Sequence, residues 1–201
     1  MTLFDKIFEQ AAAQSLLEVV AVLTAIAYLV FAIREKIICW LFAAISTAIY
    51  VWLLVVAKLY MESVLYGYYL LMAAYGFFVW RSGGDTGKGS PVVVWPLRIH
   101  LLAIVAICAL ALSNGYLLTI YSDAVFPYID SMTTWFAFWA TFLMARKVLQ
   151  NWWYWLVIDL VSVFIYFSRD LQLTSALFVL YIIMIPFGLA AWTRSFRQQE
   201  A

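Results

Sequence analysis

The chain has 201 residues, of which 67% are hydrophobic and only 11% are charged, whereas a soluble globular domain is about half apolar and a quarter charged. Its formal net charge is +1, which gives no support for a nucleic-acid partner. We therefore predict an all-α integral membrane protein with the lipid bilayer as its solvent and with room for about seven spans of ~20 residues.

The N-terminal segment carries a short amphipathic pattern. Phe4, Ile7, Phe8 and Ala11 recur at the spacing i, i+3, i+4 and i+7, which places them on one face of a helix. Residues 1–15 are therefore predicted to form a helix that lies in the membrane interface.

Seven apolar runs follow, separated by short polar breaks, and each is long enough to cross a bilayer as a helix. They cover residues 16–33, 37–57, 62–80, 97–118, 129–145, 152–168 and 172–192. The longest break, 81–91, is rich in Gly and is predicted to be a flexible linker.

Most Lys and Arg residues gather on one side of these seven spans. When sides are assigned by the parity of the spans, one side collects nine basic residues and the other three, which together account for all twelve. Loops rich in Lys and Arg stay in the cytoplasm, so we predict an external N-terminus and a cytoplasmic C-terminus. The nine are Arg34, Lys36, Arg81, Lys88, Arg98, Arg146, Lys147, Arg194 and Arg197, and the three are Lys6, Lys58 and Arg169.

The sequence repeats itself at a shift of 112 residues without a gap. The matched pairs are Arg34 with Arg146, Trp40 with Trp152, Tyr69 with Tyr181, Gly76 with Gly188, and Trp80 with Trp192. We predict that residues 16–80 and 128–192 are two copies of a three-helix unit, joined by a connector helix at 96–118. A single connector helix makes both copies start on the same side, so the repeats are parallel, as in 3+1+3 SWEET-like transporters.

Asp159 is the only acidic residue placed deep inside a span, where a charged side chain costs at least about 2.5–3.5 kcal/mol. It belongs to a stripe on one helix face, at the spacing i, i+3, i+7, i+10 and i+14: Trp152, Trp155, Asp159, Ser162 and Tyr166. Two indoles beside a carboxylate suit a flat, positively charged ring. The alternatives are a structural polar pair for Asp159 and the interfacial aromatic belt for Trp152.

The first copy keeps the aromatic residue of this stripe but not the charge. Trp40 and Thr47 stand where the second copy has Trp152 and Asp159. Such a pair of halves would suit an asymmetric ligand, since one half binds its charge and the other packs against it. Three tyrosines of the third and seventh spans are further candidates for substrate binding, or else belong to the core: Tyr66, Tyr69 and Tyr181.

No nucleophile–base pair, Gly-rich phosphate loop or metal-ligand cluster occurs in the sequence. We therefore expect no catalytic residues, no metal and no cofactor, and a transporter instead of an enzyme. Cys39 and Cys108 lie in apolar runs and are interpreted as core hydrophobes. His100 has no second ligand nearby and is expected at the interface. A retinal protein is excluded because residues 172–192 contain no Lys.

The second copy also carries a motif of a known family. The run Trp152-x-x-Trp155-x-x-x-Asp159 matches the W-x-x-W-x-x-x-N/D pattern of the PnuC family of bacterial vitamin transporters, which the chain resembles over both repeats. The other matching segments are Arg146-Lys147 before this run, Cys39-Trp40 running to Tyr50, Lys58-Leu59-Tyr60, and Tyr75-Gly76 leading to Trp80.

The resemblance implies a multi-pass, SWEET-like protein of the bacterial inner membrane, as a monomer or a homo-oligomer, that takes up a vitamin precursor by facilitated diffusion. Nicotinamide riboside is the best-known substrate of the family, and relatives carry thiamine or riboflavin. The family often has Gln at Tyr66, and nicotinamide riboside carriers often have Asn at Asp159. Nicotinamide riboside and thiamine both contain a flat cationic ring, so Asp159 suits either. A proton-coupled carrier is a further alternative, since a buried Asp can titrate.

Overall fold

The computed structural model describes residues 2–56, 60–82, 90–122 and 125–200. Most of these residues lie in eight α-helices: α1 (Leu3–Ala12), α2 (Leu16–Ile33), α3 (Cys39–Val56), α4 (Tyr60–Ser82), α5 (Leu97–Tyr121), α6 (Pro127–Ala145), α7 (Asn151–Ser168) and α8 (Gln172–Glu200). Parts of the predicted breaks after residues 57 and 118, and most of the predicted linker 81–91, lie outside the described residues.

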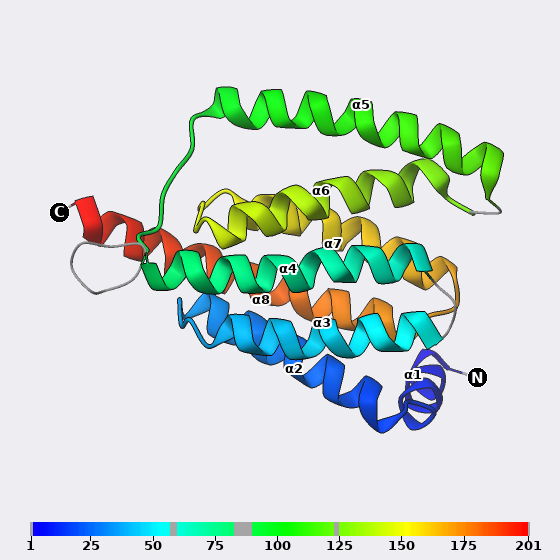
Figure 1. Cartoon of the computed structure of the whole chain (residues 1–201). Coiled ribbons are helices and arrows are strands. Elements are labelled where there is room, and N and C mark those ends of the chain that lie inside the picture. The colour runs from blue at the N-terminus through cyan, green and yellow to red at the C-terminus, as the bar shows by residue number, and fades with distance from the viewer. Residues whose placement is uncertain (1, 57–59, 83–89, 123–124, 201) are drawn as a thin grey trace.

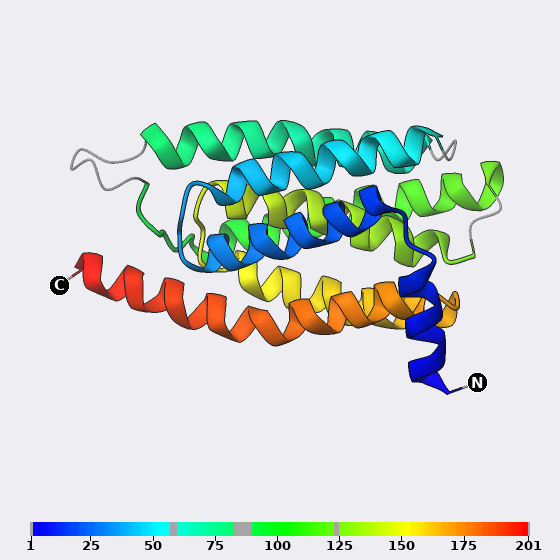
Figure 2. The same cartoon turned by 90° about the horizontal axis from the view of Figure 1, so that it is seen from below.

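Helix α1 lies across one end of the bundle, at a steep angle to α2 (Figures 1 and 2). It starts with a capping box in which the Thr2 hydroxyl accepts from the Asp5 N–H and the Asp5 carboxylate accepts from the Thr2 N–H. Phe4 and Phe8 are largely exposed. The segment thus forms an amphipathic helix, and its place in the membrane interface stays a prediction.

Polar contacts hold α1 against the start of α8. The Lys6 ammonium lies 2.9 Å from a carboxylate oxygen of Asp170, and the Gln10 amide donates to the Asp170 carbonyl at 2.7 Å. The hydrogen bond from Lys6 lowers the pKa of Asp170, because it stabilises the ionised carboxylate. Helix α1 is therefore attached to the turn before α8 by polar contacts.

The axes of helices α2 to α8 lie roughly along one direction, and the chain runs back and forth along it (Figure 1). Helix α3 packs between α2 and α4, and α7 packs between α6 and α8; α4 also contacts α6, and α8 also contacts α2. These contacts close a ring of six helices, with α5 outside it against α6. A shift of 112 residues maps α2, α3 and α4 onto α6, α7 and α8, so each helix contact of one half has a counterpart in the other.

Five of the eight helices, α2, α3, α4, α5 and α8, are long and apolar enough to cross a membrane by length and composition. Helices α6 and α7 have 19 and 18 residues and are not in this group. Both are rich in Trp and Tyr, and α7 also contains Asn151 and Asp159, which lowers their mean hydropathy. The membrane character of the chain therefore rests on these five helices.

Two turns with the same backbone hydrogen bonds connect α2 to α3 and α6 to α7. Lys36 N–H donates to the Phe31 carbonyl, and Val148 N–H donates to the Leu143 carbonyl, both at 2.9 Å. Each turn contains a non-glycine residue in the left-handed region, Glu35 at φ 53° and Lys147 at φ 51°. Since 35 and 147 are also 112 apart, the repeat in the sequence extends to the conformation of the backbone.

Helix ends differ from the predicted spans mainly in α8, which continues to Glu200 instead of ending at 192. No Gly or Pro follows Trp192, so nothing in the sequence stops the helix where the apolar run stops. Helix α5 likewise continues to Tyr121, three residues past the predicted end.

Candidate functional site

The two repeated tryptophans lie in the hydrophobic core at the end of the bundle where α3 and α7 begin. Trp40 is 2% exposed and contacts Gly76 of α4, whose missing side chain leaves room for the indole. Its ring meets Trp80 edge to face, with centroids 5.4 Å apart and planes at 86°. Trp40 is therefore held by packing on both sides.

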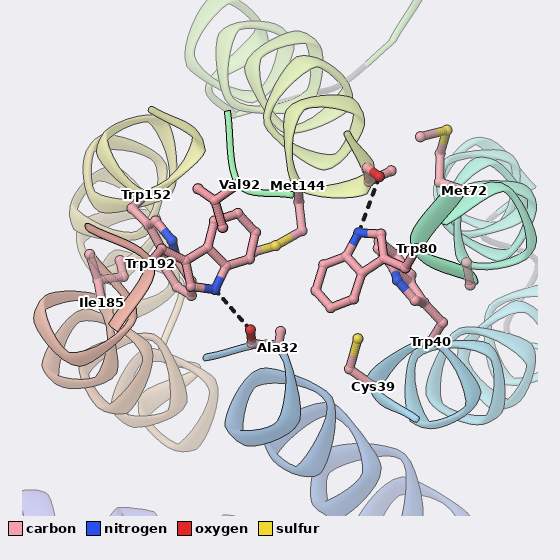
Figure 3. Packing of buried hydrophobic residues seen from close by; sticks show 12 residues of the cluster. Ala32, Cys39, Trp40, Met72, Trp80, Val92, Met144, Trp152, Ile185 and Trp192 are labelled. Atoms are coloured by element: carbon pink, nitrogen blue, oxygen red, sulfur yellow. Dashed lines mark hydrogen bonds between the residues drawn. The ribbon is translucent and has the colours of Figure 1, made fainter. Parts of the chain in front are cut away.

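The second half repeats this arrangement (Figure 3). Trp152 is 1% exposed and contacts Gly188 of α8, and its ring meets Trp192 with centroids 5.4 Å apart and planes at 86°. In this structure Trp152 thus lies among core residues and not in a lipid-facing aromatic belt. The predicted contact of Trp40 and Trp152 with substrate remains a prediction.

Asp159 lies on α7, seven residues beyond Trp152 and about 10 Å further along the helix axis at ~1.5 Å per residue. It is 3% exposed. Within the part of the chain that the structure describes, no hydrogen bond or ion pair involves its side chain, and its carboxylate lies near enough to Tyr69 and Tyr181 for its charge to act on their phenols. Because Tyr69 and Tyr181 are equivalent positions of the two halves, the carboxylate lies where the halves meet.

Aromatic pairs extend from these two tyrosines toward the opposite end of the bundle. In α4 the rings of Tyr66 and Tyr69 are 5.6 Å apart at 76°, and in α8 the rings of Phe178 and Tyr181 are 5.7 Å apart at 77°. Tyr50 of α3 adds a contact with Tyr66 at 4.9 Å. Of the predicted residues, Tyr66 and Tyr69 thus lie side by side in α4, and Tyr69 and Tyr181 lie near enough to Asp159 for its charge to act on their phenols.

Three other predicted site residues lie on α3 and α7. Trp155 is half-buried and packs against a small buried cluster formed by Ala137, Ala140 and Ile158, as Tyr69 does. The Thr47 hydroxyl donates to the carbonyl of Ala43 in its own helix at 2.7 Å. Ser162 is buried one helical turn beyond Asp159.

Tyr28 of α2 is a residue that the sequence did not single out. Its phenol interacts electrostatically with Tyr69 and Tyr181, and its ring lies 5.9 Å from that of Trp40. The equivalent position in the second half is Ala140, so a comparison of the repeats gives no signal there. The central cluster of Asp159 and tyrosines therefore contains a hydroxyl from α2 in one half and a small residue in the other.

His100 was expected at the interface and is instead buried, 6% exposed. The ring is buried because α5 packs against α6. Its Nδ1 lies 3.0 Å from the Tyr154 hydroxyl. The two are a polar contact between the connector helix and α7, separate from the cluster around Asp159.

Neither of two surface cavities contains a predicted site residue. One, of about 530 Å³, lies along the C-terminal half of α8 and includes Arg194 and Arg197; the other, of about 440 Å³, includes Trp95 and Arg146. Among the described residues no group of three or more His, Cys, Asp or Glu side chains is placed to hold a metal ion. The buried carboxylate and the phenols around it are therefore the strongest candidate site.

Comparison with known proteins places this helical membrane protein in a class of bacterial vitamin transporters. Residues 15–194 match the family described as nicotinamide mononucleotide transporter. The chain belongs to this family, to which the PnuC proteins also belong, so the resemblance seen in the motif is confirmed. Since the family consists of transporters, the prediction of a transporter and not an enzyme is confirmed as well.

Three relatives illustrate the similarity. The nicotinamide riboside transporter PnuC of Escherichia coli (strain K12) is 20% identical over 213 residues, covering 92% of this chain and 88% of the relative. The riboflavin/roseoflavin transporter RibM of Streptomyces davaonensis is 25% identical over 128 residues, covering 61% of this chain and 59% of the relative. The crystal structure of the vitamin B3 transporter PnuC superposes with a TM-score of 0.75 at 25% identity, covering 98% of this chain and 90% of that one.

Proposed function

We propose that this protein takes up a vitamin precursor that contains a flat cationic ring, with nicotinamide riboside as the first choice, by facilitated diffusion. The observation that carries the proposal is Asp159: an almost fully buried carboxylate with no hydrogen bond or ion pair among the described residues. Burying an uncompensated charge is costly. A cationic ring bound beside it would compensate that charge, and the aromatic rings around it would stack on the same ring.

We further propose that helices α2 to α8 are seven transmembrane spans, arranged as two parallel repeats, 16–80 and 128–192, with a connector at 96–118. The support is the match between equivalent contacts, since α4 packs on α6 as α8 packs on α2. The distribution of basic residues supports an external N-terminus and a cytoplasmic C-terminus in the inner membrane.

The proposed substrate site lies between the two halves. Asp159 would contact the charge, while Tyr69 and Tyr181 would contact the ring from equivalent positions of the two halves. The remaining proposed members are Trp155, Ser162, Thr47 and Tyr66, with Trp40 and Trp152 at the end of the site that faces the start of α3 and α7.

The decisive experiment compares one cationic and one neutral ligand of nearly the same shape. Nicotinamide riboside has a positively charged pyridinium ring, and its reduced form has a neutral dihydropyridine ring. We expect Asp159→Asn, which keeps a hydrogen-bonding group but loses the charge, to weaken binding of the cationic form by roughly 10- to 100-fold, the range for a hydrogen bond to a charged group. The neutral form should bind almost as before.

Thr47→Val is the matched control, because position 47 is equivalent to 159 and the change preserves shape without altering charge. It should affect both ligands alike. If Asp159→Asn weakens the cationic and neutral ligands equally, Asp159 has an architectural role and the proposal fails. Binding of thiamine in preference to nicotinamide riboside would assign the protein to the thiamine branch.

A proton-coupled carrier is the second candidate function, and Asp159 supports it as well, because an Asp without a counter-ion among the described residues can bind and release a proton. Uptake into proteoliposomes, measured with and without a pH gradient, separates the two. Gradient-dependent uptake that is lost in Asp159→Asn would favour proton coupling over facilitated diffusion.

A further inference from the structure

Glu35 and Lys147 form an ion pair between equivalent positions of the two halves. The Lys147 ammonium lies 3.0 Å from a Glu35 carboxylate oxygen, and the side chains are 6% and 20% exposed. Two residues related by a twofold arrangement can touch each other only where its axis passes. The pair therefore marks the line along which the two halves meet, at the end of the bundle where α3 and α7 begin.

Two indoles pack against each other where the two halves meet, next to the ion pair. Trp80 and Trp192 are nearly inaccessible, and their ring centroids are 6.0 Å apart. Each donates a hydrogen bond to a backbone carbonyl of the other half, Trp80 to Ala145 at 3.2 Å and Trp192 to Ala32 at 3.0 Å, as Figure 3 shows. The Lys147 ammonium lies 4.6 Å from the centre of the Trp80 ring.

We propose that Glu35, Lys147, Trp80 and Trp192 form a gate that closes the substrate site toward the cytoplasm, with the Glu35–Lys147 pair as its latch. The proposal rests on the proposed transport function, because it requires substrate to pass between the halves. A substrate beside Asp159 can leave through the end of the bundle where α3 and α7 begin only if the two halves separate there. Separation breaks the ion pair and both indole–carbonyl hydrogen bonds.

The two partners of the latch differ in how firmly they are held. The carbonyl of Lys147 accepts from Val93 N–H at 3.0 Å, and Leu149 N–H donates to the Val93 carbonyl at 2.8 Å, so the segment before α5 fixes the Lys147 turn. Glu35 has no such clamp among the described residues and is the more exposed partner. We therefore assign the movement to the turn of Glu35, whose carboxylate can exchange Lys147 for water.

Cys39 provides a natural reporter of gate opening. It is 0% exposed and belongs to the same buried core cluster as Trp80 and Trp192 (Figure 3). With Cys108→Ser as background, it is the sole cysteine of the chain. The rate at which an uncharged maleimide labels Cys39 in the purified protein, measured by mass spectrometry without substrate, then reports how often the gate opens.

We expect Glu35→Gln and Lys147→Met each to speed labelling on the order of tenfold, the factor that corresponds to a mid-range coupling energy for a contacting pair. The double variant Glu35→Lys with Lys147→Glu should return the rate to that of the background protein. Both positions have the same left-handed backbone, and the equivalence of the halves would place the new lysine over Trp192 as Lys147 lies over Trp80.

The pattern of rates excludes simpler explanations. The charges at 35 and 147 act on the Cys39 thiolate in opposite senses, so a purely electrostatic effect would move the two single variants in opposite directions and would overturn the proposal. Lys6→Ala, which breaks the ion pair with Asp170 at the other end, is the matched control and should leave the rate unchanged. Equal acceleration in Lys6→Ala would mean general loosening and would also overturn it.

The charge-swapped variant decides the matter even where a single variant does not purify. A folded swap that labels at the background rate supports the latch, and fast labelling or loss of folding overturns it. Because no substrate is present, this result is independent of the binding measurements on Asp159→Asn. The gate and the proposed substrate can therefore fail separately.

Discussion

Gly76 gives the sharpest test of the packing around the gate. A Cβ added there would lie 2.6 Å from Cη2 of the Trp40 ring and closer still to Cζ2. The indole cannot withdraw, because it is 2% exposed and packs edge to face on Trp80. Gly76→Ala must therefore displace either α4 or the indole itself.

The size of the effect follows from a comparison within one helix. Gly67 also lies in α4, and a Cβ there would meet no atom of the described residues within 4 Å. Both Ala variants gain the same helix propensity, so their difference isolates the overpacking, which costs about 1–3 kcal/mol. For a chain of this length that corresponds to a difference of roughly 2–12 °C in melting temperature.

The assay is thermal unfolding of the two purified variants in the same detergent. We expect Gly67→Ala to melt at or above the wild-type temperature and Gly76→Ala to melt below it. Gly188→Ala should behave like Gly76→Ala, because its Cβ would lie 2.6 Å from Cζ3 of Trp152. Equal melting temperatures for the Gly67 and Gly76 variants would refute the close approach of the Trp40 indole to the backbone of α4.

Two further predictions concern the site and the topology. Trp155→Ala should weaken substrate binding by about 1–3 kcal/mol, the scale of a lost base–aromatic stack, with little change in melting temperature. Trp152→Ala should mainly destabilise the fold, by roughly 3–5 kcal/mol. Isothermal titration measures the affinity and thermal unfolding the stability, and unchanged affinity in Trp155→Ala would remove this residue from the proposed site. The predicted orientation places a reporter enzyme fused after residue 201 in the cytoplasm. A fused reporter whose activity is found only outside the cell would reverse that orientation.

Part of the candidate site could be predicted because its signal is local. Asp159 stands out in the sequence because a charge inside an apolar run is expensive wherever the helix packs. Tyr69 and Tyr181 could be found as a pair because the 112-residue repeat puts them in register. Tyr28 gave no such signal, since its equivalent is Ala140 and its position near the site depends on how α2 packs in the ring.

The sequence by itself determined the membrane environment, the helical class and the repeat, because hydropathy and register are properties of the chain alone. Only the tertiary structure decided where the aromatic residues lie, since a tryptophan on a helical stripe can equally face lipid, substrate or core. It buried Trp40 and Trp152 against Gly76 and Gly188 and placed Tyr69 near Asp159. It also joined Glu35 to Lys147, since the contact of two residues 112 apart exists only once the ring of helices closes.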